Sequence, residues 1–299
     1  MKFVELGSYN MEALEDLAEI QPLEFAEKYL LLRLDYILGF IKKIFPENYD
    51  LFVRNLEKNY SESKAVDYVR NKKFDITKTI ARFKNLNKHK QLAVKSLDYF
   101  LGLLELDPQA NWEKEKLKAT KRNNLRAYLI PSYQNFVSLS DTIGREDAIK
   151  LAKQFITEYT IFSNKDIKTK YSTLDELWED DIKDFENNGN PGWIRIEGNV
   201  ENGRLVNRRD TCLWAEAIKD LPDSYFRYLA ACYGDFQGAQ VYWNKHFILT
   251  MKHTIAKGDP YCSCVVHDTR IDWDLTHPDE EFWESISPLK EWQKKKEMK

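Results

Sequence analysis

Cysteine, proline, glycine and long apolar runs are all scarce in this sequence, and several of these shortages exclude a class of protein. Four cysteines among 299 residues are too few for a small secreted fold held together by disulfides. The longest apolar stretch, residues 29–41, is too short to cross a bilayer and is interrupted by Arg33 and Asp35. The N-terminus lacks the apolar core of a secretory signal. We therefore expect a cytoplasmic protein with reduced thiols and no membrane partner.

Several well-known functional motifs are missing as well. The sequence has no P-loop, no GxGxxG fingerprint, and neither HExxH nor GxSxG. Its net charge of -3 gives no general attraction to nucleic acid. The stretch 70–90 carries eight basic residues and one acid, but no nucleic-acid motif accompanies it. We interpret this stretch as a solvated helical surface, with an acidic partner as the alternative role, and we do not expect nucleic acid to bind.

The first part of the chain is patterned for helices. Residues 1–128 contain only three glycines and three prolines, and apolar residues recur there every three or four positions. Pro131 is predicted to mark a junction, so we expect a helical N-terminal domain over 1–128 and a second domain over 129–299. Helices are predicted at residues 23–45, 47–59, 61–71, 75–85, 88–105, 112–128, 132–142, 145–162 and 173–187.

The second part of the chain changes to strands joined by turn sequences. Asn202-Gly203 between two alternating runs is a strong hairpin signal, and residues 257–260 form a second turn between strands. The tail from residue 270 is expected to wrap around this domain. The pattern predicts an α+β fold, in which a helical N-terminal region precedes a small, mainly antiparallel sheet covered by helices. The predicted elements are strands at 193–199, 204–209, 246–256 and 262–268, and helices at 212–219, 222–233 and 234–241.

The side chains able to carry chemistry are concentrated in the second domain. All four cysteines lie between residues 212 and 264, and four of the five histidines lie between 246 and 277. Cys232 is expected late in a helix, with Asp235 three residues further along the same face. A carboxylate alone raises the pKa of a thiol, so Cys232 needs a cation or a histidine to become a nucleophile. A buried structural cysteine is the alternative interpretation.

The other three cysteines fall at the ends of strands and helices. Cys212 follows Arg208 and Arg209 at a strand-to-helix junction, where helix N–H groups favour a thiolate, although a packed first-turn residue is the alternative. Cys262 and Cys264 share one face of a strand because side chains alternate. Their spacing is not that of a zinc knuckle, and a divalent metal would need further ligands from elsewhere. No cofactor is predicted.

Strand alternation also separates the histidines. His253 is predicted to point inward with Leu249 and Met251, which makes it the candidate general acid or base, with a satisfied core histidine as the alternative. His267 points away from the strand cysteines and is predicted to lie at the surface. Asp259 belongs to the second turn, where it either bonds local amides or contacts a substrate.

Four short motifs in this region resemble those of a known family. Residues 125–270 resemble the L-2-amino-thiazoline-4-carboxylic acid hydrolase family, and the second turn with its following cysteine is also similar to the small-molecule-binding V4R domains. The motifs are RDTCLWAEAIKDL at 209–221, AACYGD at 230–235, YWNKHF at 242–247 and TIAKGDPYC at 254–262. Carried over onto this sequence, the resemblance highlights Cys212, Cys232, Asp235, Asn244, Gly258, Asp259 and Cys262.

The resemblance implies a hydrolase of carbon–nitrogen bonds other than peptide bonds, acting on a small cyclic C=N or amide-like substrate such as a 2-amino-thiazoline carboxylate. In this scheme Cys232 adds to the electrophilic carbon, His253 moves protons, and Asp235 holds the substrate or orients the base. Arg208 or Arg209 pairs with a substrate carboxylate. Metal-activated water is the competing mechanism. The alternative function is a non-catalytic small-molecule- or metal-binding sensor fused to a helical interaction module, and the sequence leaves homo-oligomerisation open.

Overall fold

The computed structural model describes residues 2–7, 11–61, 67–188, 194–200 and 202–286. Contacts divide the chain into two compact units. Glu15–Tyr159 form one, called the helical unit, and Met1–Leu14 with Thr160–Lys299 form the other, called the sheet unit. The boundary predicted between residues 128 and 129 lies inside helix α7 (Lys121–Ile143). The first residues of the chain therefore belong to the same unit as its C-terminal half.

The helical unit is built mainly from long helices that pack on one another. Its elements are β2 (Leu17–Ile20), α1 (Pro22–Ala26), the π-helical turn η2 (Glu27–Leu31), α2 (Leu32–Ile44), η3 (Pro46–Asn48), α3 (Tyr49–Ser61), α4 (Tyr68–Asn71), α5 (Ile76–Ile80), η4 (Leu86–Lys88), α6 (Lys90–Leu103), β3 (Leu117–Thr120), α7 and α8 (Arg145–Ser163). Helices α2, α3, α6 and α7 bury Leu34, Leu56, Phe100 and Phe136. The apolar stripe predicted from the sequence thus faces neighbouring helices.

Two local predictions in this unit are wrong. Pro131 does not interrupt the chain but lies inside α7, where its carbonyl oxygen accepts a hydrogen bond from the Tyr60 hydroxyl at 3.1 Å. A proline inside a helix costs about 3 kcal/mol, which the buried packing of α7 outweighs. Residues 117–120 form β3 instead of a helix, because they pair antiparallel with the distant β2.

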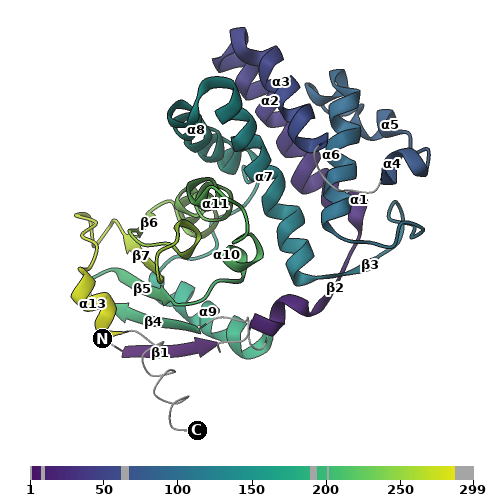
Figure 1. Cartoon of the computed structure of the whole chain (residues 1–299). Helices are drawn as coiled ribbons and strands as arrows, with labels where there is room; N and C mark the ends of the chain where they lie inside the picture. The colour runs from purple at the N-terminus through teal and green to yellow at the C-terminus, as the bar shows by residue number, and fades with distance from the viewer. Residues whose placement is uncertain (1, 8–10, 62–66, 189–193, 201, 287–299) are drawn as a thin grey trace. The chain divides into compact units, whose positions relative to one another are not determined.

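A five-stranded antiparallel sheet forms the centre of the sheet unit. Its strands are β1 (Lys2–Gly7), β4 (Ile194–Val200), β5 (Arg204–Arg209), β6 (Phe247–Met251) and β7 (Cys262–Asp268), in the order β1-β4-β5-β7-β6 (Figure 1). Both predicted hairpins are confirmed. Asn202 and Gly203 have φ of 73° and 80°, in the left-handed region that asparagine and glycine adopt most readily in tight turns. The edge strand β1 was not predicted from the sequence, because its partner β4 lies in the other half of the chain.

Helices and the C-terminal segment cover the two faces of this sheet. On one face, Leu177 and Ala239 pack in a cluster with Val266. On the other face, Trp283 packs with Val265. The predicted α+β class, with an antiparallel sheet covered by helices, is confirmed. None of the helices in the described residues is both long and apolar enough to cross a membrane. The covering elements are α9 (Leu174–Asn188), α10 (Leu213–Ala217), α11 (Ser224–Ala231), α12 (Gly234–Gly238), η5 (Ala239–Trp243), η6 (Ile255–Lys257) and α13 (Glu280–Ser285).

Candidate functional site

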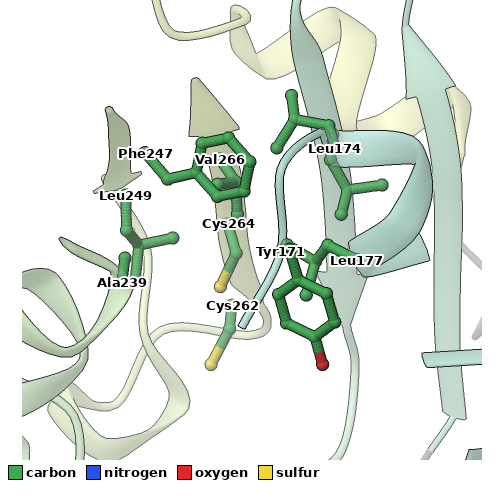
Figure 2. Packing of buried hydrophobic residues seen from close by; sticks show 10 residues of the cluster. Tyr171, Leu174, Leu177, Ala239, Phe247, Leu249, Cys262, Cys264 and Val266 are labelled. Atoms are coloured by element: carbon green, nitrogen blue, oxygen red, sulfur yellow. The ribbon is translucent and has the colours of Figure 1, made fainter. Parts of the chain in front are cut away.

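The register of β5 and β7 places several chemically capable side chains on one face of the sheet. Arg209 pairs with Cys262 and Asn207 pairs with Cys264, and directly paired residues of antiparallel strands point to the same face. Figure 2 shows Cys262, Cys264 and Val266 in sequence along β7, with both sulfur atoms toward the same side. We call this side the cysteine face.

Two more cysteines and a carboxyl group reach the cysteine face from the helices. Cys212 is the N-cap residue of α10, directly after β5, and Cys232 is the C-cap residue of α11. Asp235 lies in the first turn of α12. Electrostatic interactions join Cys232 to Cys262, Cys212 and Asp235. The fold therefore gathers residues that are separate in the sequence into one group.

Arg209 supplies the positive charge in this group. Burial disfavours its charged form, but the thiols and the carboxyl group around it, with Cys264 the strongest, raise its pKa above the ordinary arginine value. Its Nε donates to Asn207 Oδ1 at 3.1 Å, which fixes the side chain. The structure records no ion pair between Arg209 and any residue it describes. The guanidinium is charged at every physiological pH and has capacity for an anionic partner.

Asp235 is the group of the cysteine face that ionises closest to neutral pH. Desolvation raises the pKa of its carboxyl group to about 6, although the charge of Arg209 acts in the opposite direction. The residue is nevertheless exposed to solvent. Protein atoms therefore surround the carboxyl group while water still reaches it. No residue in the described part of the chain donates a hydrogen bond to it. Such a group is able to exchange protons near pH 6.

The thiols differ in how strongly their surroundings oppose ionisation. Burial raises the pKa of Cys232 and of Cys262 above the ordinary thiol value. Burial also raises the pKa of Cys212, but the backbone N–H of Ala215 and the charge of Arg209 act against this rise. Cys212 is half-buried, whereas the other three cysteines are buried. Cys212 therefore has the surroundings closest to those of a reactive thiolate.

All four cysteines are free thiols. Within the described residues, no group of three or more His, Cys, Asp or Glu side chains is arranged to hold a metal ion. The chemistry that the cysteine face offers from its own side chains is thus that of thiols, one guanidinium and one carboxyl group.

The opposite side of β7, which we call the histidine face, carries a chain of hydrogen bonds. His267 Nδ1 lies 2.5 Å from Asp272 Oδ2, and His267 Nε2 lies 2.8 Å from Thr250 Oγ1. Thr250 Oγ1 lies 2.9 Å from His277 Nδ1. His277 Nε2 lies 3.2 Å from Ser263 Oγ. Each ring nitrogen and hydroxyl group in this chain therefore has a partner.

Two predictions about histidines are wrong. His267 does point away from the cysteines, but it is fully buried instead of lying at the surface, because the segment 269–286 covers the histidine face. His253 does not point inward beside Leu249, because β6 ends at Met251 and the strand alternation stops there. Its Nδ1 lies 3.2 Å from Ser263 Oγ, on the histidine face. The structure therefore separates His253 from the thiols that it was expected to serve.

The two predicted arginines point to opposite faces. Arg208 lies on the histidine face, where its Nη2 donates to Asp210 Oδ1 at 2.7 Å and its guanidinium carbon lies 3.8 Å from the ring centroid of Tyr261. Its side chain is almost completely buried. Of the two, Arg209 is the one beside the thiols.

Two predicted substrate-binding residues, Asn244 and Asp259, make hydrogen bonds to the backbone. Asn244 donates from Nδ2 to the Tyr171 carbonyl oxygen at 2.8 Å, and its Oδ1 accepts from the His246 N–H at 3.0 Å. Asp259 Oδ2 accepts from the Thr254 N–H at 2.7 Å and closes the turn before β7. Both side chains thus have structural partners that account for their positions.

Two residues near the thiols were not identified from the sequence. Lys257 Nζ lies 3.9 Å from the ring centroid of Tyr228. Burial raises the pKa of the Tyr228 hydroxyl, and the neighbouring Tyr225 and Cys232 act in the same direction. Lys257 belongs to the Lys-Gly-Asp motif, and its place in that motif is the sequence feature that could have identified it as a site residue. Tyr228 had no comparable signal, because aromatic residues on helices are usually part of a core.

Residues of the cysteine face lie inside a segment of the chain that matches a known protein family. A family model described as L-2-amino-thiazoline-4-carboxylic acid hydrolase matches residues 122–265. The predicted resemblance to this family is confirmed. The matched residues include Arg209, Cys212, Cys232, Asp235 and Cys262, and they make up a little under half of the chain. The comparisons with curated proteins and with solved structures gave no significant match.

Proposed function

We propose that the cysteine face is the active site of a hydrolase for small cyclic C=N compounds that carry a carboxylate, of the 2-amino-thiazoline-4-carboxylate type. The description of the matching family supports a hydrolase. The observation that carries the proposal is the grouping of Arg209 and Asp235 with Cys212 inside the matched residues. These side chains supply an anion-binding group, a proton carrier and a nucleophile.

Arg209 has the role of binding the substrate carboxylate. Its charge is permanent and no acidic residue in the described chain neutralises it through an ion pair. A guanidinium holds a carboxylate through two parallel N–H bonds, which fixes the ring as well as the charge. Asn207 keeps the guanidinium in place. The amidine-like carbon of the bound ring would then face the thiols.

The proposed reaction uses Cys212 as the attacking group and Asp235 as the proton carrier. Sulfur bonds to the C=N carbon while the thiol proton passes through Asp235 to the ring nitrogen. One ring heteroatom then leaves that carbon and takes up the proton that a nitrogen still bound to the carbon releases as a C=N bond forms again, which opens the ring. Water next attacks the same carbon, and the Cys212 thiol leaves with its proton restored. The sum is addition of one water molecule to the substrate.

The choice of Cys212 over Cys232 is tested by matched variants. We expect Cys212→Ala to lower kcat for 2-amino-thiazoline-4-carboxylate by about a hundredfold or more, because nucleophilic attack is lost. Cys232→Ala is the control, with a change of only a few-fold expected, because Cys232 is buried and its thiolate is more strongly disfavoured. Full activity in Cys212→Ala would exclude Cys212 as the attacking group, and full activity in both variants would remove thiol attack from the mechanism and leave water activated by Asp235.

A binding module without catalysis is the second candidate function. The raised pKa of the thiols favours it, because a protonated thiol is a poor nucleophile. In that case Arg209 and Asp235 hold a carboxylated ligand and nothing reacts. Calorimetric titration with the thiazoline decides between the two: saturable binding without any turnover supports the module, and turnover supports the hydrolase.

A further inference from the structure

A buried cation without an acidic partner lies in the helical unit. Arg33, on α2, is only 8% exposed. The structure records no ion pair between Arg33 and any residue that it describes. An uncompensated charge in a protein interior is strongly unfavourable, and buried charges are therefore usually paired. Arg33 departs from that rule and calls for a counter-ion.

The hydrogen bonds of Arg33 leave one edge of its guanidinium unused. Nη1 donates to the Tyr128 carbonyl oxygen at 3.1 Å and to Ser132 Oγ, both on α7. Nε and Nη2 donate to no residue in the described chain. The Nε–Nη2 edge presents two parallel N–H groups, which match two oxygens of a carboxylate or a phosphate. The bonds on Nη1 keep that edge in a fixed orientation.

Tyrosine rings surround this guanidinium. Its central carbon lies 5.1 Å from the ring centroid of Tyr128 and 5.8 Å from that of Tyr159 on α8. Tyr29 packs edge-on against Tyr128, and Tyr36 does the same against Tyr159. All four tyrosines are only half-buried, so solvent reaches the edges of this enclosure. Aromatic faces attract a cation but leave its net charge in place.

The helix that carries Arg33 has an uncommon turn immediately before it. Glu27–Leu31 form the π-helical turn η2 between α1 and α2. Its last bond runs from the Leu32 N–H to the Glu27 carbonyl oxygen. Single π-helical turns are rare and occur frequently at functional sites. This observation is independent of the charge and of the hydrogen bonds of Arg33.

We propose that Arg33 anchors a binding site for a small oxyanion, a carboxylate or phosphate group, formed by α2, α7 and α8. Two oxygens of the anion accept from Nε and Nη2, and the tyrosine rings contact the body of the ligand. The bound anion neutralises the buried charge. The site belongs to the helical unit and does not depend on the hydrolase proposed for the sheet unit.

The proposal is tested by anion binding to the full-length protein. Thermal unfolding is followed in chloride, in inorganic phosphate and in benzoate, at matched pH and ionic strength, and affinity is measured by calorimetry. We expect phosphate, benzoate or both to raise Tm in a saturable way by a few degrees over chloride, because a ligand of the folded state stabilises it. The two arms separate a phosphate ligand from a carboxylate ligand.

Two substitutions identify the residue responsible. Arg33→Met should abolish the anion-dependent rise in Tm, and Arg33→Lys should weaken binding at least tenfold while keeping the charge, because lysine cannot form the paired bonds. Arg70→Met is the matched control, since Arg70 is exposed and paired with Asp67 at 2.9 Å, and it should bind like the wild type. The proposal is overturned if the wild type behaves alike in all three salts. Equal affinity in wild type and Arg33→Lys also overturns it.

Discussion

The cysteine face and the histidine face belong to the same strand, β7, but their polar side chains are in opposite situations. On the histidine face, His267, Thr250, His277 and Ser263 bind one another and end at Asp272. On the cysteine face, the charge of Arg209 and the carboxyl group of Asp235 have no ion-pair partner among the described residues. Groups that satisfy one another stabilise a fold, whereas groups left unsatisfied are available to a ligand.

The same contrast between satisfied and available groups separates two arginines that are adjacent in the sequence. Arg208 and Arg209 are adjacent, yet Arg208 is paired with Asp210 and stacked on Tyr261, while Arg209 faces the thiols. Residue type alone therefore does not identify a functional arginine. A functional arginine is identified by the face of the strand on which it lies and by its partners on that face. This comparison predicts that substitutions on the cysteine face reduce activity, and that substitutions on the histidine face reduce stability.

The largest expected effect is on catalysis at Asp235. Asp235→Asn should lower kcat by about 10²–10⁴-fold, the range typical for loss of a proton-transfer group. In the wild type, activity should fall as pH drops through about 6, because the carboxyl group, with its raised pKa, then becomes protonated. The asparagine variant should lack this limb of the pH profile. Ser263→Ala on the histidine face is the control and should change kcat by less than about twofold, while an equal loss in both variants contradicts the comparison.

The adjacent arginines give the next largest effects, in two different assays. Arg208→Met should lower the free energy of unfolding by about 3–5 kcal/mol, because it leaves Asp210 as an unpaired buried charge. Arg209→Gln should raise KM by about 10–100-fold with little loss of stability, because it removes the partner of the substrate carboxylate. Urea unfolding and steady-state kinetics on both variants provide the measurements. Exchange of the two phenotypes would refute the assignment of faces.

The histidine face should give a smaller, pH-dependent effect on stability. Burial, with the charges of Lys252 and of the neighbouring histidines, lowers the pKa of His277 to about 4 from 6.5. As pH falls, the unfolded chain takes up this proton first, so stability decreases between pH 6.5 and 4 and changes no further below that. The expected loss is about 1–2 kcal/mol, allowing for partial exposure to solvent.

Urea unfolding at pH 7.5, 5.5 and 4.5 measures this loss, and His277→Gln provides the comparison. In the glutamine variant, the free energy of unfolding should fall by about 1–2 kcal/mol less over this pH range, since the glutamine side chain does not titrate. An unchanged pH dependence in His277→Gln would show that His277 does not carry the effect.

The smallest expected effect is at the turn between η6 and β7. Gly258 has φ of +106°, and an added Cβ would meet no atom within 4 Å. Gly258→Ala should therefore cost about 1 kcal/mol of stability through backbone strain alone, with activity retained. Thermal unfolding and a kcat measurement check both parts. A large loss of activity would give this turn a role in the site that its contacts do not indicate.

Much of the local structure could be predicted from the sequence, because it depends on local signals. Asn202-Gly203 identified a hairpin, and alternation along β7 correctly placed Cys262 and Cys264 on one face and His267 on the other. The sequence also singled out Cys212, Cys232 and Asp235, which the fold brings together. The periodicity of a segment correctly predicts the faces of its side chains where the helix or strand extends over its whole predicted length.

The failures come from information that lies outside the local sequence. His253 was misplaced because β6 ends at Met251, whereas the strand was predicted to continue to residue 256. His267 was predicted to be exposed because nothing in β7 shows that the segment 269–286 folds over it. Strand β1 went unpredicted because its partner is remote in the chain. In each case a contact between distant segments decided the outcome.

Turnover of 2-amino-thiazoline-4-carboxylate by the protein, followed by chromatography between pH 5 and 9, decides whether the cysteine face is a hydrolytic site. We predict saturable loss of the substrate with formation of the ring-opened product. The rate should decline below about pH 6 and should be strongly reduced in Arg209→Gln and Asp235→Asn. Absence of turnover across this pH range, or full activity in both variants, would contradict the assignment of the cysteine face as a hydrolytic site.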